Sequence, residues 1–177
     1  MSDDELIIVA NRLPVEAVTD PDGNISWNVS PGGLVAAVEP SLKGRQGVWI
    51  GWNGHYQDPS EPAMPPIPET AEGRDYRIVE VPLDKSDVEQ YYDGFSNSAL
   101  WPLYHDAIAT PTYHRHQFDA YRRVNMLFAQ AAARAAAPGA TVWIHDYQLQ
   151  LVPAMLRSLR PDLRIGFFLH IPFPAPD

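Results

Sequence analysis

Short, continuous apolar runs recur along the chain and predict strands. The first run, residues 6–10, reads Leu-Ile-Ile-Val-Ala, and similar runs cover residues 48–52, 77–81, 141–145 and 164–170. Apolar runs of this length, without polar alternation, are typical of strands buried on both faces of a parallel sheet. We therefore expect a sheet that is covered on both sides.

Helical patterns separate most of these runs. The longest expected helix covers residues 114–137 and carries apolar side chains at helical spacing, namely Phe118, Tyr121, Val124 and Phe128. A second helix is expected to begin at the capping-box sequence Ser86-Asp87-Val88-Glu89 and to stop at Gly94. Shorter helices are expected over residues 34–44, with a glycine cap at Gly44, over 97–104, and from 146 to about 160.

Turn-forming residues mark two other segments. Residues 15–18 and 25–29 flank the sequence Asp-Pro-Asp-Gly-Asn, which indicates a β-hairpin inserted after the first strand. Residues 53–75 are rich in proline and are expected to form a surface loop. The remaining alternation of strands and helices implies βαβ units. We expect a single α/β domain over residues 1–177, with a Rossmann-like, mostly parallel sheet and helices on both faces.

Composition and charge narrow the classes of partner. The chain has 13 basic and 22 acidic residues, a net charge of −9, and no cysteine. A negative field of this size disfavours nucleic acid and acidic membranes, so neither is an expected partner. The absence of cysteine excludes disulfides and thiolate metal sites. The acidic start of the chain and its short first apolar run predict a cytoplasmic protein without a signal peptide.

Polar or glycine residues follow four of the predicted strands. Asn11-Arg12 follow the first, Gly51-Trp52 end the second, and Asp146 and His170 end the last two. Ligands of open parallel sheets bind outside the carboxyl ends of the strands, so these residues are expected to line one crevice. An anion bound there would depend on a single arginine or a helix N-terminus to offset the negative field.

Each candidate also has a structural explanation. Asp146 can serve only as a helix N-cap, and Arg12 only as a surface salt-bridge partner. His170 can be a hydrogen-bonded histidine at a strand end. Gly32-Gly33 can form only a tight turn, while Tyr92 and Trp101 can be core residues. Because the candidate residues are expected to converge on one edge of the sheet, the functional interpretation is favoured.

Other catalytic motifs are missing from the sequence. It contains no G-x-G-x-x-G, no G-x-x-x-x-G-K-[ST] and no G-x-S-x-G. His114 and His116 are two residues apart and would not share a helix face, so a zinc site is not expected. We expect neither a metal nor a cofactor.

Several motifs in order resemble one known family. They are NRLP from residue 11, SPGGL from residue 30, QYYDGFSNSALWPLYH from residue 90, YRRVN from residue 121, WIHDYQLQLVP from residue 143 and IGFFLHIPFP from residue 165. The chain resembles the N-terminal part of trehalose-6-phosphate synthases, retaining glycosyltransferases of B type with two Rossmann-like domains around a cleft. The resemblance implies transfer of glucose from a nucleotide-glucose, typically UDP-glucose, to glucose 6-phosphate, without a metal.

The resemblance also implies roles for individual residues on the acceptor side. Arg12 would contact the phosphate of glucose 6-phosphate. Tyr92 and Trp101 would line the acceptor pocket. Asp146 would bind the acceptor hydroxyls and count among the catalytic residues. A guanidinium suits this task, because it is always charged and binds phosphate as a two-pronged donor.

On the donor side, the resemblance places Gly32 and Gly33 on a loop that approaches the phosphates of the donor. His170 would approach the donor glucose near the reacting carbon and act as a second catalytic residue. Retention in the family is explained by front-side attack, in which the leaving phosphate takes the acceptor's proton, so no side-chain nucleophile is needed. Binding geometry and charge stabilisation would then supply the rate.

The chain ends at Asp177, where many members of the family have Glu. We expect it to be an incomplete chain, the acceptor-side half of a larger enzyme whose second, nucleotide-sugar domain follows. Such a full-length protein could form a homo-oligomer. Two alternatives remain open at this point: a glucosylglycerol-phosphate synthase-like enzyme, and a non-catalytic half that only binds sugar phosphates.

Overall fold

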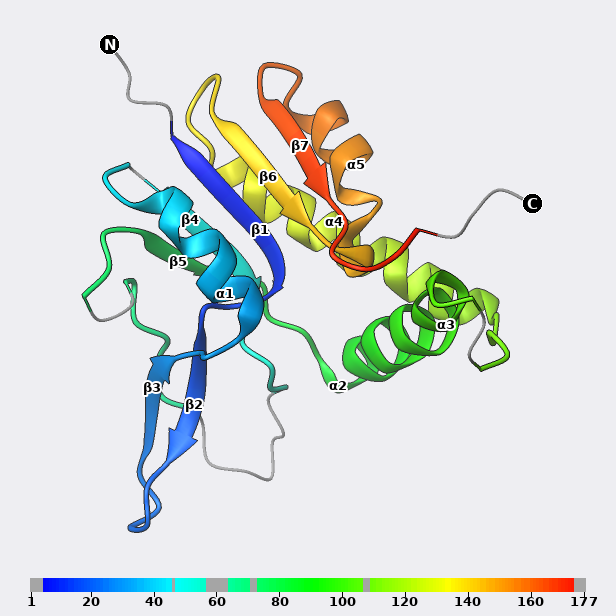
Figure 1. Ribbon diagram of the computed structural model, residues 1–177, viewed down its shortest axis with the longest axis horizontal. Helices are drawn as coiled ribbons and strands as arrows, with labels where there is room; N and C mark the ends of the chain where they lie inside the picture. The colour runs from blue at the N-terminus through cyan, green and yellow to red at the C-terminus, as the bar shows by residue number, and fades with distance from the viewer. Residues whose placement is uncertain (1–4, 46, 57–63, 71–72, 107–108, 174–177) are drawn as a thin grey trace.

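A parallel sheet forms the centre of the molecule. The computed structural model describes residues 5–45, 47–56, 64–70, 73–106 and 109–173. Within them, a five-stranded sheet has the order β5-β4-β1-β6-β7, and every neighbouring pair is parallel (Figure 1). The strands are β1 Leu6–Arg12, β4 Gly47–Trp52, β5 Arg77–Glu80, β6 Thr141–His145 and β7 Arg164–Phe168. The expected α/β class and parallel sheet are therefore confirmed.

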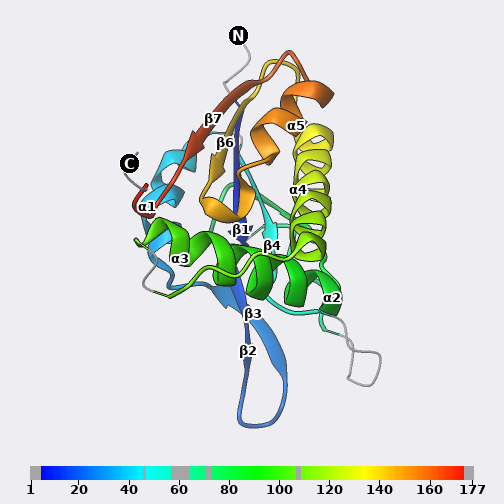
Figure 2. The same cartoon turned by 90° about the vertical axis from the view of Figure 1, so that its right-hand side faces the viewer.

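Helices cover both faces of this sheet, as Figure 2 shows from the side. On one face, α4 (Arg115–Ala135) and α5 (Val152–Leu159) pack on alternate residues of β1, β4 and β6. On the other face, α1 (Gly33–Val38) and the 3-10 turn η1 (Glu39–Leu42) cover the intervening residues. Burial on both faces explains why β1 and β4 are continuous apolar runs rather than alternating ones.

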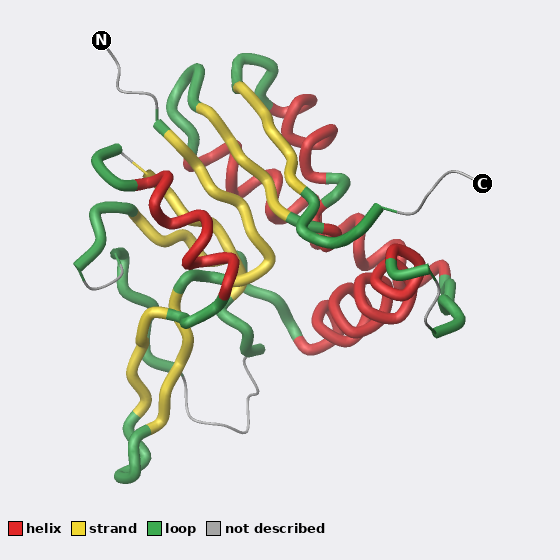
Figure 3. The backbone as a smooth tube through the Cα atoms, in the orientation of Figure 1, coloured by secondary structure: helices red, strands yellow, loops and turns green. Residues whose placement is uncertain are grey.

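The hairpin and the glycine cap occur where the sequence predicts them. Strands β2 (Val15–Thr19) and β3 (Ile25–Val29) pair antiparallel and project away from the main sheet (Figure 3). Their turn is held by Asp20, whose carboxylate accepts the backbone N–H of Asp22 and Asn24 at 2.9 and 2.8 Å. Gly44 has φ +71°, the left-handed conformation expected after the α1–η1 segment.

The proline-rich segment lies only partly within the described chain, since residues 57–63, including Pro59 and Pro62, and residues 71–72 fall outside it. The described part forms no long element, and only an isolated bridge pairs Thr70 with Arg77. The Trp27 indole N–H donates to the Pro65 carbonyl at 3.1 Å, which ties this segment to the hairpin. Asp177, where the resemblance led us to expect a departure from the family, also lies outside the described residues.

The helices after β5 differ from the expectation. Gly94 does not stop a helix, because α2 (Lys85–Asp87) continues through the π-helical stretch η2 (Val88–Leu100) into α3 (Trp101–Tyr104). A Cβ on Gly94 would stand 2.8 Å from the Gln117 amide nitrogen, so this glycine permits close packing against α4. The cap is also shifted: Asp84, not Ser86, accepts the backbone N–H of Asp87 at 2.7 Å.

The last two predicted elements also need correction. The helix expected from residue 146 to 160 is divided into the 3-10 turn η3 (Tyr147–Leu149) and α5. The last strand ends at Phe168, two residues before His170. Within the described residues β7 is an outer strand of the sheet, and its Phe167 and Phe168 side chains are 41% and 49% exposed.

Candidate functional site

The strand order creates a crevice at one place along the carboxyl edge of the sheet. From β1 the chain builds β4 and β5 on one side, and later β6 and β7 on the other. Connections that leave neighbouring strands in opposite directions open a gap between them, and ligands of such sheets bind there. In this fold the gap lies beyond β1 and β6, the strands that end at Arg12 and His145.

A cavity of about 280 Å³ occupies this position. Five of the seven residues to which the family resemblance assigns roles line it, namely Arg12, Gly32, Gly33, Tyr92 and Asp146. Asn11, Trp49, His145 and Gln148 also contribute to its wall. Residues from the first strand, the first helix, the π-helical stretch and the sixth strand therefore meet at one site, as the topology rule predicts.

Arg12 is the last residue of β1, and its exposed side chain is held by two neighbours. Its guanidinium lies over the Trp52 ring, 5.2 Å from the ring centroid. Gly54 packs directly against it: a Cβ there would stand 2.0 Å from Arg12 Nη2, and Gly54 has φ +92°. Within the described residues no carboxylate forms an ion pair with Arg12. The salt-bridge explanation therefore finds no support there, and the guanidinium is free to meet an anion.

Asp146 both caps a turn and faces the cavity. Its carboxylate oxygen Oδ1 accepts the backbone N–H of Tyr147 at 3.0 Å and that of His170 at 3.3 Å. Its backbone has φ +76° and ψ 169°, a region that is nearly restricted to glycine. A residue with a side chain costs about 1–3 kcal/mol in such a conformation. A carboxylate that a strained backbone presents at a topological switch point is a candidate for a role beyond capping.

Two adjacent tyrosines of the π-helical stretch lie in different environments. Tyr91 is completely buried, and its hydroxyl donates to Asn11 Oδ1 at 2.7 Å. Tyr92 contacts the cavity and meets the Trp52 ring edge-on at 5.6 Å. Tyr92 is thus not an ordinary core residue. Tyr91 instead fixes the end of β1, next to Arg12.

Two further polar wall residues, Asn11 and Gln148, receive no individual ligand-binding role from the sequence. Asn11 is marked only by its place at the end of a strand. Gln148 is buried, and its Oε1 has no hydrogen-bond partner among the described residues. Its only sequence signal is its position two residues after Asp146.

Gly32 and Gly33 stand at the start of α1, and the fold does not require glycine at either position. Gly32 has an ordinary extended backbone with φ −60°, and a Cβ there would meet nothing closer than Ser30 Oγ at 3.6 Å. A Cβ on Gly33 would meet nothing within 4 Å. The tight-turn explanation therefore lacks a steric basis. The open space in front of both residues is what a backbone approaching a ligand requires.

Trp101 is the candidate that the structure does not bring to this cavity. It opens α3, is 39% exposed and stacks on His105 with ring centroids 4.0 Å apart. Its exposure argues against the core explanation. It is also absent from the described wall of the cavity, so it does not join the other candidates there.

His170 lies beside the cavity rather than in its wall, in contact with a second histidine. His145 Nδ1 and His170 Nε2 are 2.9 Å apart, and the rings stack at 5.2 Å. His145 is fully buried against Trp143, whose ring centroid is 4.6 Å away. Burial, and secondly the neighbouring His170, lower the pKa of His145 to about 4. His145 is therefore neutral at physiological pH.

The low pKa of His145 predicts a loss of stability in mild acid. An unfolded chain protonates this histidine near its ordinary pKa of 6.5, while the folded chain resists protonation until about 4. Stabilisation is therefore complete above about pH 6.5 and is lost as the pH falls toward 4. We expect the contribution of His145 to the unfolding free energy to drop by roughly 2 kcal/mol between about pH 7.5 and 5.

Urea unfolding of the wild type and of His145→Phe over this pH range measures the difference. Phenylalanine keeps the aromatic contact with Trp143 but cannot titrate. The variant should lose less stability than the wild type on acidification. Parallel pH profiles would show that His145 does not control this part of the curve.

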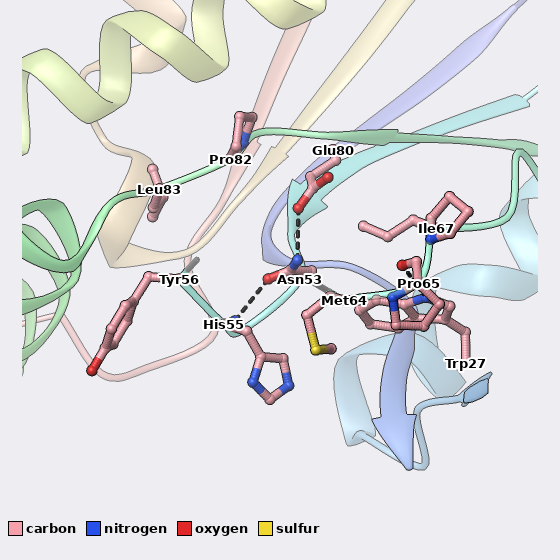
Figure 4. A pocket seen from close by; sticks show the side chains of 11 residues that line it. Trp27, Asn53, His55, Tyr56, Met64, Pro65, Ile67, Glu80, Pro82 and Leu83 are labelled. Atoms are coloured by element: carbon pink, nitrogen blue, oxygen red, sulfur yellow. Dashed lines mark hydrogen bonds between the residues drawn. The ribbon is translucent and has the colours of Figure 1, made fainter. Parts of the chain in front are cut away.

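A second cavity of similar size lies beyond β4 and β5, shown in Figure 4. Its wall includes Trp27, Met64 and Ile67 and an amide–carboxylate pair, in which Asn53 Nδ2 donates to Glu80 Oε1 at 2.7 Å. Burial raises the pKa of Glu80. None of the sequence-predicted site residues lines this cavity, and it is not at the switch point.

The described part of the chain shows no metal-type cluster, meaning no group of three or more His, Asp or Glu side chains placed to hold an ion. His114 and His116 stack on each other at 5.4 Å. None of the helices in the described ranges combines the length and the apolar character needed to cross a membrane.

Comparison with known proteins identifies close relatives. The model of glycosyltransferase family 20 matches residues 4–177. The trehalose-6-phosphate synthase of Mycolicibacterium gilvum (strain PYR-GCK) is 58% identical over 170 residues, which are 96% of this chain and 33% of that protein. The chain thus spans about a third of the length of the curated relatives it matches.

Solved structures agree with the sequence comparison. A UDP-forming α,α-trehalose-phosphate synthase from Burkholderia vietnamiensis superposes with a TM-score of 0.76 at 35% identity, covering 99% of this chain and 35% of that one. A Burkholderia xenovorans synthase in complex with glucose-6-phosphate gives a TM-score of 0.74 at 36% identity, covering 97% and 34%.

Proposed function

Because this chain belongs to glycosyltransferase family 20, we propose that it is the acceptor-side part of an enzyme that makes trehalose 6-phosphate. The enzyme would transfer glucose from UDP-glucose to the anomeric oxygen of glucose 6-phosphate, with retention of configuration. The observation that carries this proposal is that the guanidinium of Arg12, which has no ion-pair partner among the described residues, and the carboxylate of Asp146, on a strained backbone, line one cavity at the switch point. In this proposal the guanidinium of Arg12 binds a phosphate, and the carboxylate of Asp146 accepts hydrogen bonds from sugar hydroxyls.

On the acceptor side, Arg12 would bind the phosphate of glucose 6-phosphate. The net charge of −9 makes a local cation necessary, and a guanidinium donates two parallel hydrogen bonds to phosphate oxygens. Trp52 and Gly54 hold it in place, so little of its freedom is lost on binding. Asp146 would accept hydrogen bonds from the sugar hydroxyls, and Tyr92 would pack against the ring.

On the donor side, the backbone N–H groups of Gly32 and Gly33 would approach the diphosphate of UDP-glucose. His170 would face the donor glucose. The new bond joins the donor's anomeric carbon to the acceptor oxygen on the face from which UDP departs, and the leaving phosphate takes the acceptor's proton. A second domain, which we place in the longer protein, would complete the nucleotide site. The cysteine-free composition supports a cytoplasmic location.

Replacement of Arg12 tests the acceptor assignment. A charged hydrogen bond contributes about 1.5–3 kcal/mol. In the full-length enzyme, meaning the longer protein of which we propose this chain is a part, Arg12→Ala should raise the half-saturating concentration of glucose 6-phosphate by roughly ten- to a hundred-fold. Initial rates at saturating UDP-glucose measure this directly.

Two companion variants sharpen the test. Arg12→Lys keeps the charge but not the two-pronged geometry, so it should recover part of the loss. Gly54→Ala leaves Arg12 in the sequence but forces the guanidinium to move, since the new Cβ would overlap Nη2. It should weaken the binding of glucose 6-phosphate, as Arg12→Lys does. An unchanged half-saturating concentration in Arg12→Ala would remove Arg12 from the acceptor site.

A further inference from the structure

His145 is a buried titratable residue to which the proposed reaction assigns no role. It is 0% exposed, and its Nε2 has no hydrogen-bond partner among the described residues. Its single described ring contact of hydrogen-bonding type is Nδ1 to His170 Nε2 at 2.9 Å. Because His145 is buried and makes one described polar ring contact, the position of its proton constrains the position of the proton on His170.

The pair allows two arrangements of its protons when both rings are neutral. A neutral imidazole has one N–H donor and one bare acceptor nitrogen. If Nδ1 of His145 carries the proton, it donates to His170 and leaves only a bare lone pair buried at Nε2. If Nε2 carries the proton, a buried N–H is left without an acceptor. Orphaned buried N–H groups are rare, because their desolvation is not repaid by a hydrogen bond.

The first arrangement has a consequence for His170. Its Nε2 must then be the acceptor, so its own proton sits on Nδ1. The two ring nitrogens point in widely different directions, so Nδ1–H is directed away from His145. His170 is exposed, which leaves this N–H open to a ligand.

No other described group competes for the His170 ring. The carboxylate of Asp146 accepts the backbone N–H of His170, at 3.3 Å, and not a ring nitrogen. Phe168 contacts the ring at 4.7 Å but offers no hydrogen bond. The tautomer of His170 is therefore set by His145.

We propose that His145 is a positioning residue that holds His170 as its Nδ1–H tautomer, with that N–H presented to the donor sugar. The last clause rests on the proposed function, whereas the tautomer does not. His170 would then meet the donor as a hydrogen-bond donor of fixed direction and need not reorganise during the reaction.

Nitrogen NMR of the chain itself tests the tautomer without any activity. In protein labelled with ¹⁵N-histidine, long-range proton–nitrogen spectra at neutral pH distinguish protonated from bare ring nitrogens for each of the six histidines. We expect His170 to show a protonated Nδ1 and a bare Nε2, the reverse of the tautomer that free histidine favours. His170 with a protonated Nε2, or with averaged nitrogens, would overturn the proposal.

Variants separate positioning from packing. His145→Phe keeps the aromatic contact with Trp143 but removes the donor, so His170 should revert to the Nε2–H tautomer. His145→Asn places an amide N–H near the position of Nδ1 and should restore Nδ1–H on His170. His116→Phe is the matched control, because His114 and His116 stack at a similar interplanar angle, 24° against 28°, without a described hydrogen bond between them. It should leave the His170 spectrum unchanged.

Kinetics of the full-length enzyme complete the test. His145→Phe should lower turnover about tenfold, the effect of one misdirected hydrogen bond, and leave the half-saturating glucose 6-phosphate concentration unchanged. His145→Asn should recover most of the turnover. Equal turnover in the wild type and His145→Phe would contradict the positioning role. A wild-type enzyme that transferred no glucose would overturn the proposed function, while the spectra alone would decide the tautomer.

Discussion

A protein made of these 177 residues alone is expected to transfer no glucose from UDP-glucose to glucose 6-phosphate. The chain spans about a third of the length of its relatives, and under the proposed function it would supply only one wall of a two-substrate site. Holding two reactants in a productive geometry contributes about 7–11 kcal/mol to such reactions. Loss of one substrate's anchors removes most of that contribution.

The charge of the cavity gives an independent reason. Of the described residues that line it, Arg12 alone is basic. The N–H groups of Gly32 and Gly33 can approach a diphosphate but cannot neutralise the charge that develops on UDP as it leaves. If Arg12 binds the acceptor phosphate, as we propose, it cannot also neutralise the donor.

The measurement compares the chain with a completed enzyme. Product formation is followed with the purified chain, and then after addition of the remaining two thirds of the Mycolicibacterium gilvum relative as a separate protein. Only the mixture should form trehalose 6-phosphate. Glucose 6-phosphate binding to the chain, followed by NMR, should persist weakly and disappear in Arg12→Ala. Product formed by the chain alone would contradict the view that this chain supplies only one wall of a two-substrate site.

Asp146→Asn is expected to lower turnover of the full-length enzyme about a hundredfold with little change in stability. Asparagine caps helical turns about as well as aspartate, so the bond to the backbone N–H of Tyr147 should survive. The amide removes the negative charge and one acceptor site, so the acceptor sugar is no longer held in the productive orientation. Turnover and thermal unfolding of the same preparations measure both effects.

A pair of truncations tests whether the backbone strain at Asp146 serves the side chain. Asp146→Ala and Asp146→Gly both remove the carboxylate, and both should be as inactive as Asp146→Asn or more so. Only glycine accepts φ +76° and ψ 169° without strain. Asp146→Gly should therefore be more stable than Asp146→Ala by about 1–3 kcal/mol. If Asp146→Asn unfolds easily while each folded molecule keeps full activity, Asp146 is only a cap.

Patterns local in sequence predict the framework of this protein correctly. Continuous apolar runs identify β1, β4 and β6, because burial on both faces leaves no room for polar alternation. The period of the long helix and the turn at Asp20 also follow from interactions within a few residues. The parallel strand order then places Arg12 and Asp146 at one edge, and the order of motifs indicates the family.

Contacts between distant segments decide the rest. Gly94 looks like a helix stop, but its role depends on Gln117, which packs against it from another helix. The last apolar run looks buried, but within the described residues β7 is an outer strand and its Phe167 and Phe168 side chains are exposed.

The finer geometry of the site depends on tertiary structure for the same reason. His145 and His170 are separated by 25 residues, and nothing in either local pattern predicts a hydrogen bond between their rings. The positive φ of Asp146 arises where its own backbone N–H donates to the Phe168 carbonyl. Gly54 matters only because Arg12 lies against it. The sequence by itself therefore determined most of the elements, their order and the candidate residues. The tertiary structure alone decided which side chains meet, because those energies come from neighbours that are remote along the chain.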